Sequence, residues 1–128
     1  MPSIRPQYHF RKTSNGLDAF DVRKLIKLSS TLPIKKIDPQ SIAELDEDHW
    51  YAGGGVPSAR SILEHMALIE ACDLDYPVIL DQQGRLMDGM HRVCKAVIQG
   101  EKEILAVQFA NDPTPDYINC NPQELPYD

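Results

Sequence analysis

The sequence has little cysteine, few aromatic residues and no long apolar run. Its three cysteines, Cys72, Cys94 and Cys120, are odd in number and form no C-x-x-C pair, which argues against a disulfide framework. We therefore expect the reducing cytoplasm as the compartment. No run approaches the roughly 20 apolar residues that a membrane-spanning helix needs, and the first residues contain no apolar signal segment. The sequence thus predicts neither a transmembrane nor a secreted protein.

The sequence also has few positively charged residues. The 13 Lys and Arg residues are outnumbered by 19 Asp and Glu residues, which gives a net charge of −6. Proteins that bind duplex DNA usually carry the opposite balance, because they neutralise phosphates along the helix. Binding of duplex DNA by this chain alone is therefore not expected, although a small basic patch would be enough to hold one phosphate group.

What is present is an ordinary globular composition. Hydrophobic residues make up 42% and charged residues 25% of the 128 positions, which predicts one domain over residues 1–128. Residues 1–16 are predicted to be an extended lead-in, and residues 111–128 a proline-rich tail. Aromatic residues near both ends leave a homodimer open, because these segments pack either on the domain or on a second copy.

The pattern of apolar residues predicts an α+β fold with a small mixed sheet and three main helices. The helices are expected at about 18–31, 57–72 and 89–98, and the strands at 34–37, 77–80, 85–87 and 104–109. Residues 40–50 are expected to hold one helical turn with Ile42 and Leu45 pointing inward. A loop is predicted at the glycines of 53–55. The second helix is expected to bury an apolar stripe made of Ile62, Leu63, Met66 and Ile69.

The strongest chemical signal is the run MDGMHR at residues 87–92, which follows a predicted strand and opens a predicted helix. The first turn of a helix leaves backbone N–H groups without internal partners, and the helix dipole adds positive charge there. Gly89 allows a ligand to approach the backbone closely. Arg92 offers a planar fork that suits phosphate oxygens, and His91 donates a hydrogen bond or carries a proton near neutral pH. With Lys95 adding charge on the same side, the run predicts an anion-binding site.

A structural interpretation of the same run stays open. In that interpretation Asp88 caps the helix, Arg92 is a solvated surface residue and His91 is a packing residue. The two interpretations differ in one observable feature. Either these three side chains converge on an open cleft, or internal hydrogen bonds consume them.

The stretch from Pro77 to Phe109 contains strand, turn, strand, DGxHR, helix, glycine and strand, in that order. In this it resembles the core of the ParB/sulfiredoxin-like superfamily, which includes the N-terminal domain of chromosome-partitioning ParB proteins, sulfiredoxin and the archaeal-type free serine kinase. The resemblance implies that the motif after the hairpin holds nucleotide phosphates. A nucleotide of the ATP or CTP class is the implied cofactor, and a requirement for Mg²⁺ is left open. The motif itself is most similar to that of the serine kinase.

Two differences from the superfamily argue against two of its activities. Met90 stands where sulfiredoxin carries its reactive cysteine, and a thioether is not the nucleophile that a thiolate is. ParB proper continues into a helix-turn-helix domain and a dimerisation segment, whereas only a short tail follows Phe109. Neither sulfiredoxin chemistry nor DNA partitioning by this chain alone is therefore expected.

The predicted function is binding of a nucleotide or other phosphorylated small molecule at the start of the third helix. Gly89 and Met90 are expected to offer backbone N–H groups, while His91 and Arg92 clamp phosphate. A phosphotransferase or ATP-hydrolysing reaction is the enzymatic version, with Asp88 and His91 as catalytic candidates. The residues leave open whether the chain catalyses any reaction.

Residues outside the motif complete the predicted site. The resemblance to the serine kinase implies a catalytic carboxylate after the first strand, where Glu44, Asp46 and Glu47 occur. Asp46 is the candidate named here, but the choice among the three stays open, and a solvated acidic face is the structural alternative. On the second helix, Arg60 and His65 are candidate ligand-binding residues.

No metal site is predicted, because His65 and His91 without a spaced third ligand are a weak pattern. Two other functional classes stay open. One is a non-catalytic interaction or regulatory module linked to DNA partition systems, in which the anion site is structural. The other is a nuclease, which needs clustered carboxylates for metal and a basic groove that the net charge does not predict.

Overall fold

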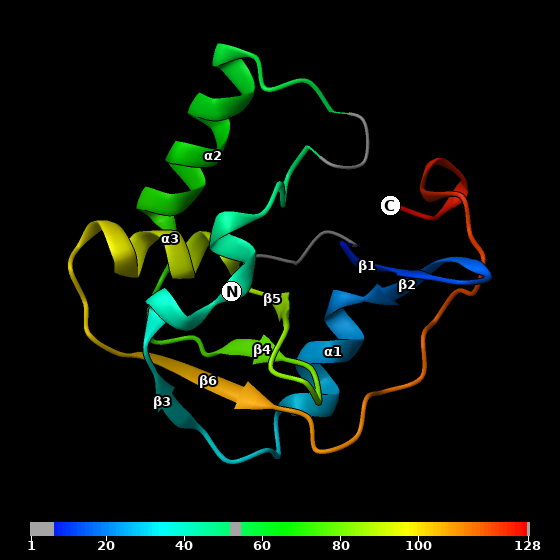
Figure 1. Ribbon diagram of the computed structural model, residues 1–128, viewed down its shortest axis with the longest axis horizontal. Coiled ribbons are helices and arrows are strands. Elements are labelled where there is room, and N and C mark those ends of the chain that lie inside the picture. Colours follow the sequence, from blue (N-terminus) through cyan, green and yellow to red (C-terminus); the bar gives the residue numbers. More distant parts are fainter. Residues whose placement is uncertain (1–6, 52–54, 128) are drawn as a thin grey trace.

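The computed structural model describes residues 7–51 and 55–127, and its centre is a four-stranded mixed sheet (Figure 1). The strands are β3 (Lys35–Ile37), β4 (Val78–Leu80), β5 (Leu86–Asp88) and β6 (Ile104–Gln108), in the order β3-β6-β4-β5. β4 runs parallel to β6, whereas the β3–β6 and β4–β5 pairs are antiparallel. The prediction of an α+β fold with a small mixed sheet and three helices is therefore confirmed.

The helices α1 (Val22–Ser29) and α3 (Met90–Ile98) cover opposite faces of this sheet. Alternate residues of a strand point to opposite faces, so Val78 and Leu80 of β4 pack with Val93 of α3. Ile79, which lies between them in the chain, packs instead with Leu25 of α1. Both cores are thus built on the same central strands, and β5 leads directly from the core into α3.

Within the described chain, residues 7–16 do not form the expected extended lead-in, and residues 1–6 of that prediction lie outside the described residues. Residues Tyr8–Thr13 form β1, which pairs antiparallel with β2 (Gly16–Asp21) in a separate two-stranded sheet. Gly16 makes the turn between them with a φ of +126°, a conformation that glycine adopts without strain. The first helix consequently begins four residues later in the chain than predicted. It starts at Val22, where the Asp21 side chain accepts a hydrogen bond from the backbone N–H of Arg23 as an N-cap.

The tail packs on this hairpin. Asp116 accepts a hydrogen bond from the backbone N–H of Asp21 at 2.7 Å, and Ala19 bridges to Tyr117. The Tyr8 ring contacts the rings of Tyr117 and Tyr127 with centroid distances of 5.9 and 5.3 Å. The aromatic residues near the two ends therefore pack against each other within one copy of the chain.

The expected buried stripe on the second helix is wrong. In α2 (Ala59–Ala71), none of the thirteen residues is buried, and all of them lie in the described part of the chain. Leu63 and Met66 are 62% and 56% exposed. α2 projects away from the sheet and meets α3 near one end (Figure 1). The half-buried face carries Ser61, His65 and Ile69, so only Ile69 of the expected stripe is even partly buried, because α2 packs on the short α3 and not across the sheet.

Other local predictions hold. The segment after β3 forms two short 3₁₀ helices, η1 (Pro39–Ser41) and η2 (Ala43–Asp46), with Ile42 buried and Leu45 packed against the core. A third 3₁₀ helix, η3 (Pro122–Glu124), lies in the tail. The loop predicted around Gly53 and Gly54 falls outside the described residues.

Lys95 is not part of an anion site, because its ammonium group caps α2. Lys95 Nζ donates to the carbonyl oxygens of Glu70 and Cys72 at 2.9 and 2.7 Å. A cation at a helix C-terminus satisfies carbonyls that have no internal partner and opposes the helix dipole. This contact fixes the end of α2 to the middle of α3.

We expect Lys95→Met to lower the free energy of unfolding by about 1 kcal/mol, because the apolar stem is kept while two charged hydrogen bonds are lost. Urea unfolding measures this change. Lys102→Met is the matched control, since Lys102 is exposed and its replacement should stay within about 0.5 kcal/mol of wild type. Equal effects of the two substitutions would show that the Lys95 contact does not stabilise α2.

Candidate functional site

The run at residues 87–92 lies where β5 turns into α3, and the turn requires glycine. Gly89 has a φ of +115° and precedes the first helical residue. A Cβ atom at this position would lie 2.6 Å from Val78 Cγ1 and 2.9 Å from Arg92 Nη2. Both the backbone conformation and the close approach of β4 therefore exclude a side chain here.

The first turn of α3 presents three backbone N–H groups, those of Met90, His91 and Arg92, which we call the α3 N–H cluster. The first intrahelical hydrogen bond runs from Val93 N–H to the Gly89 carbonyl at 3.0 Å, so these three groups precede the hydrogen-bonded ladder. No side chain of the described residues caps α3. The α3 N–H cluster consequently keeps its full capacity to donate to an anion.

Asp88 binds Arg92 and does not cap the helix. Its Oδ2 atom accepts from Arg92 Nη2 at 3.2 Å, and the same nitrogen lies 3.4 Å from the Pro77 carbonyl oxygen. Arg92 Nε is buried and has no hydrogen-bond partner among the described residues. In the guanidinium group, Nη2 lies beside Gly89 and is held by Asp88, whereas the buried Nε donor is left unsatisfied.

His91 contacts His65 of α2, the other histidine among the candidate site residues. His65 Nδ1 and His91 Nε2 lie 2.9 Å apart, a hydrogen bond in which one ring donates and the other accepts. Trp50 stacks on both rings, with centroid distances of 4.0 Å to His65 and 5.2 Å to His91. The three aromatic side chains, which we call the Trp–His stack, hold the start of α3 against α2.

The environment of His91 keeps its ring neutral at pH 7. Burial, followed by the charges of His65, His49 and Arg92, lowers the pKa of His91 to about 4. A neutral ring donates at most one hydrogen bond, and Nε2 already faces His65. At pH 7 His91 can therefore offer a phosphate at most one hydrogen bond and no positive charge.

The three acidic candidates after β3 have separate environments. Glu44 is buried, with 6% of its surface exposed, and its Oε2 atom accepts from the backbone N–H of Leu86 at 3.0 Å. Glu47 forms a two-pronged ion pair with Arg85. Asp46 is exposed. The solvated-face interpretation thus describes Asp46 but fails for Glu44.

Arg60 is exposed in the first turn of α2. It enters none of the ion pairs found in the described chain, so the structure does not join it to the Trp–His stack or to Arg92. His65 is therefore the candidate on α2 that the structure brings to the start of α3.

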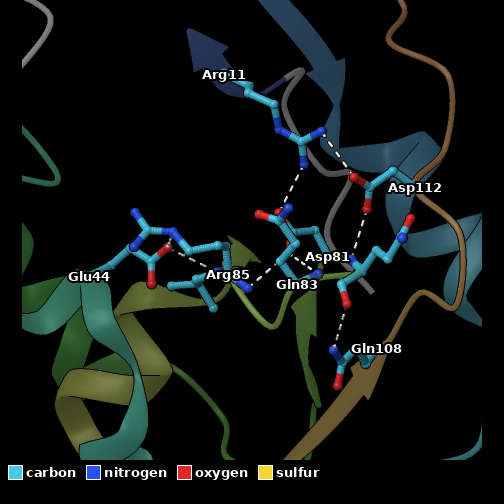
Figure 2. A network of polar contacts seen from close by, with 9 residues as sticks. Arg11, Glu44, Asp81, Gln83, Arg85, Gln108 and Asp112 are labelled. Carbon is cyan, nitrogen blue, oxygen red and sulfur yellow. Dashed lines mark hydrogen bonds and ion pairs between the residues drawn. The ribbon is translucent and has the colours of Figure 1, made fainter. Parts of the chain in front are cut away.

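A polar network beside β1 was missed by sequence reasoning (Figure 2). Arg11 of β1 donates to Asp81 at 2.9 Å and to Asp112 at 3.2 Å, while Arg85 lies 3.1 Å from Glu44. Figure 2 shows Arg11 and Glu44 approaching the β4–β5 turn from two sides. Alternating residues in 8–13 were the available signal, but the residues were assigned to a lead-in, and separations of 70 and 101 positions between partners have no local signature.

Within the described ranges, no group of three or more His, Cys, Asp or Glu side chains is arranged to hold a metal ion. No helix there is both long and apolar enough to span a membrane. Comparisons of the chain with protein-family models, curated proteins and solved structures found no match. The site geometry and the motif at residues 87–92 are therefore the observations that bear on function.

Proposed function

We propose that this chain binds a nucleotide or other phosphorylated small molecule at the start of α3. The observation that carries the proposal is the α3 N–H cluster, which precedes the first intrahelical bond at Val93. Backbone N–H groups at a helix start are a common phosphate site, because they donate to oxygens without the cost of ordering side chains. The missing Cβ of Gly89 lets Val78 and the guanidinium group of Arg92 lie directly against the start of the helix.

Arg92 is the side chain that complements this cluster. Its guanidinium group lies against Gly89 and retains a buried donor at Nε. A phosphate oxygen would compete with Asp88 for Nη2, so binding is expected to loosen the 3.2 Å contact between Asp88 and Arg92. Asp88 therefore positions Arg92 when no ligand is bound.

Phosphoryl transfer to a hydroxyl group is the catalytic extension of this proposal. Such a reaction needs a group that accepts the hydroxyl proton. His91 is in its proton-accepting form at pH 7, because burial lowers its pKa to about 4. Asp88 and Asp46 remain the carboxylate candidates, and Mg²⁺ would add positive charge on the phosphates.

A non-catalytic interaction module is the second candidate function. The exposed apolar side chains of α2, such as Leu63 and Met66, favour it, since contiguous exposed apolar surface often marks an interaction site. The Asp88–Arg92 contact supports it too, because it consumes part of the motif internally. In this case the chain would not bind nucleotides at all.

Thermal unfolding with ATP, ADP, CTP and GTP, each with and without Mg²⁺, tests the proposal. A ligand at about 100 times its Kd stabilises the folded state by roughly 2.7 kcal/mol, which for a domain of this size raises Tm by very roughly 10 °C. We expect such a rise for at least one nucleotide. The comparison of the four identifies the base.

Arg92→Gln is expected to reduce the rise in Tm by more than half, because it removes the charged donor beside the α3 N–H cluster. Lys102→Gln removes the same charge from an exposed position and should leave the rise intact. No rise with any nucleotide at millimolar concentration contradicts the proposal and favours the interaction module.

A further inference from the structure

A second polar site lies apart from α3, in a cavity between β1 and the β4–β5 turn. The cavity has a volume of about 430 Å³, within the range of small-molecule sites. Its walls include Arg11 and Lys12 of β1, Glu44 of η2, and Asp81 and Arg85 of the turn. The residues of the α3 N–H cluster are not among those that line it, so it is independent of the proposed phosphate site.

Two carboxylates of this cavity have every oxygen engaged. Asp81 Oδ1 accepts from the backbone N–H groups of Gln83 and Arg85, and its Oδ2 accepts from Arg11. Asp112 accepts from the backbone N–H of Gln82 and from Arg11. These two groups therefore hold the β4–β5 turn and the β1 hairpin in place and have no need of a ligand.

Glu44 is different, because half of its carboxylate is unused. Oε2 accepts from Leu86 N–H and lies 3.1 Å from Arg85 Nε. Oε1 is buried and has no hydrogen-bond partner in the described chain. A buried charged oxygen without a donor costs free energy, and Glu44, at 6% exposure, faces the cavity.

The two arginines nearby are already committed to carboxylates. Arg11 is shared between Asp81 and Asp112, and the Nη1 and Nη2 atoms of Arg85 bind Glu47. Lys12 is exposed. Of the three carboxylates that line the cavity, Asp81 and Asp112 share Arg11, and Glu44 shares Arg85 with Glu47, which lies outside the lining. The charge of Glu44 is therefore only partly neutralised by its ion pair.

We propose that this cavity binds a small primary amine, whose ammonium group donates a hydrogen bond to Glu44 Oε1. An ammonium group supplies both the missing donor and further positive charge. The alkyl part of the ligand lies along Phe10 and Leu86, which also line the cavity. A neutral alcohol of the same size satisfies the hydrogen bond but not the charge.

Amide chemical shifts of the full ¹⁵N-labelled chain test this inference with putrescine as the probe. The Leu86 N–H donates to the same carboxylate and so reports on Glu44 directly. We expect saturable shifts of the Leu86 and Arg85 amides below about 10 mM putrescine. Butane-1,4-diol and matched NaCl should not produce them. No saturable shift, or the same shift with the diol or with NaCl, overturns the inference and shows that the cavity is filled by water or simple ions.

Glu44→Gln should weaken putrescine binding at least about tenfold, whereas Asp46→Asn removes an exposed carboxylate from the same 3₁₀ helix and should not. Equal weakening by both variants would mean that net charge, and not Glu44, attracts the amine, and the site would be rejected. The wild-type comparison of amine with diol decides the question if Glu44→Gln does not fold. Shifts of the Met90–Arg92 amides on addition of nucleotide are separate signals, so failure of either proposal leaves the other testable.

Discussion

Gly89→Ala is expected to lower the free energy of unfolding by about 3 kcal/mol or more. An alanine at a φ of +115° is strained by roughly 1–2 kcal/mol. Its Cβ would also lie 2.6 Å from Val78 Cγ1, and overpacking of a core commonly costs about 1–3 kcal/mol more. Val78 is 1% exposed in the central strand β4, so it cannot move aside without disturbing the sheet.

Gly100→Ala separates the two contributions to this loss. Gly100 follows α3 with a φ of +72°, but nothing lies within 4 Å of a Cβ built there. We expect it to cost only about 1 kcal/mol, the strain of the left-handed conformation alone. Urea unfolding of both variants measures the difference. Equal losses would mean that the approach of Val78 to Gly89 is not as close as the structure has it.

Acidification from pH 7 to pH 5 is expected to destabilise the protein by on the order of 2 kcal/mol, after allowance for partial solvent screening of the rings. The folded state holds His9 and His91 neutral. Burial, and then the charge of Arg11, lowers the pKa of His9 to about 4, and burial with neighbouring charges does the same for His91. Unfolded histidine titrates near 6.5.

The direction in which stability changes with pH depends on which state, folded or unfolded, binds more protons. Between pH 6.5 and pH 4 the unfolded chain protonates both histidines while the folded chain does not, so stability falls as the pH is lowered through this window. The ion-paired carboxylates of Asp21 and Glu47 have lowered pKa values, and their contribution is lost only below their unfolded values near 4. The interval from pH 7 to pH 5 therefore isolates the histidines.

His9→Gln and His91→Gln should each reduce the loss between pH 7 and pH 5 by roughly a third to a half, because each removes one group that must protonate on unfolding. His49, whose pKa burial also lowers, contributes to the remainder. Both variants are expected to be less stable than wild type at pH 7, since His91 loses its contact with His65. The quantity to compare is therefore the difference between the two pH values. A difference that neither substitution changes would show that other groups cause the acid sensitivity.

The sequence predicted best where a pattern is local and repeated. Met90 and Val93, spaced as neighbours on one face of a helix, both lie in the core, and the glycine after β5 marks the helix start that the structure has. The β4–β5 hairpin was equally visible, because its turn residues lie between two short apolar runs. These elements carry the α3 N–H cluster, so the location of the candidate site was accessible from sequence.

Predictions failed where contacts between segments far apart in the sequence determine the local structure. Residues 8–13 form a strand because they pair with 16–21 and are covered by the tail at Tyr117, and the tail contact has no local signature. α2 has more apolar residues than its single packing face can cover. The face that contacts α3 carries His65 and not Met66. Glu44 sits in an acidic run typical of a solvated surface, yet Leu86 N–H and Arg85 hold it inside.

Contacts with distant segments also determine which side chains of the motif at residues 87–92 bind one another. Sequence spacing places Asp88, His91 and Arg92 together but does not say which of them bind one another. Asp88 and Arg92 are four residues apart and form an ion pair, whereas His91 turns to His65, which lies 26 positions away. The groups of the motif that stay available to a ligand are the backbone N–H groups of the first turn of α3. No pattern of side chains in the sequence reveals them.

The most direct test of the proposed phosphate site is an amide chemical-shift titration of the ¹⁵N-labelled chain with ATP and with CTP. If phosphate binds as proposed, the N–H groups of Met90, His91 and Arg92 donate hydrogen bonds to its oxygens and show the largest saturable shifts, with Gly89 beside them. The same titration of Arg92→Gln should show weaker binding at the same amides. Saturable shifts confined to other segments, or none up to about 10 mM nucleotide, would contradict the account.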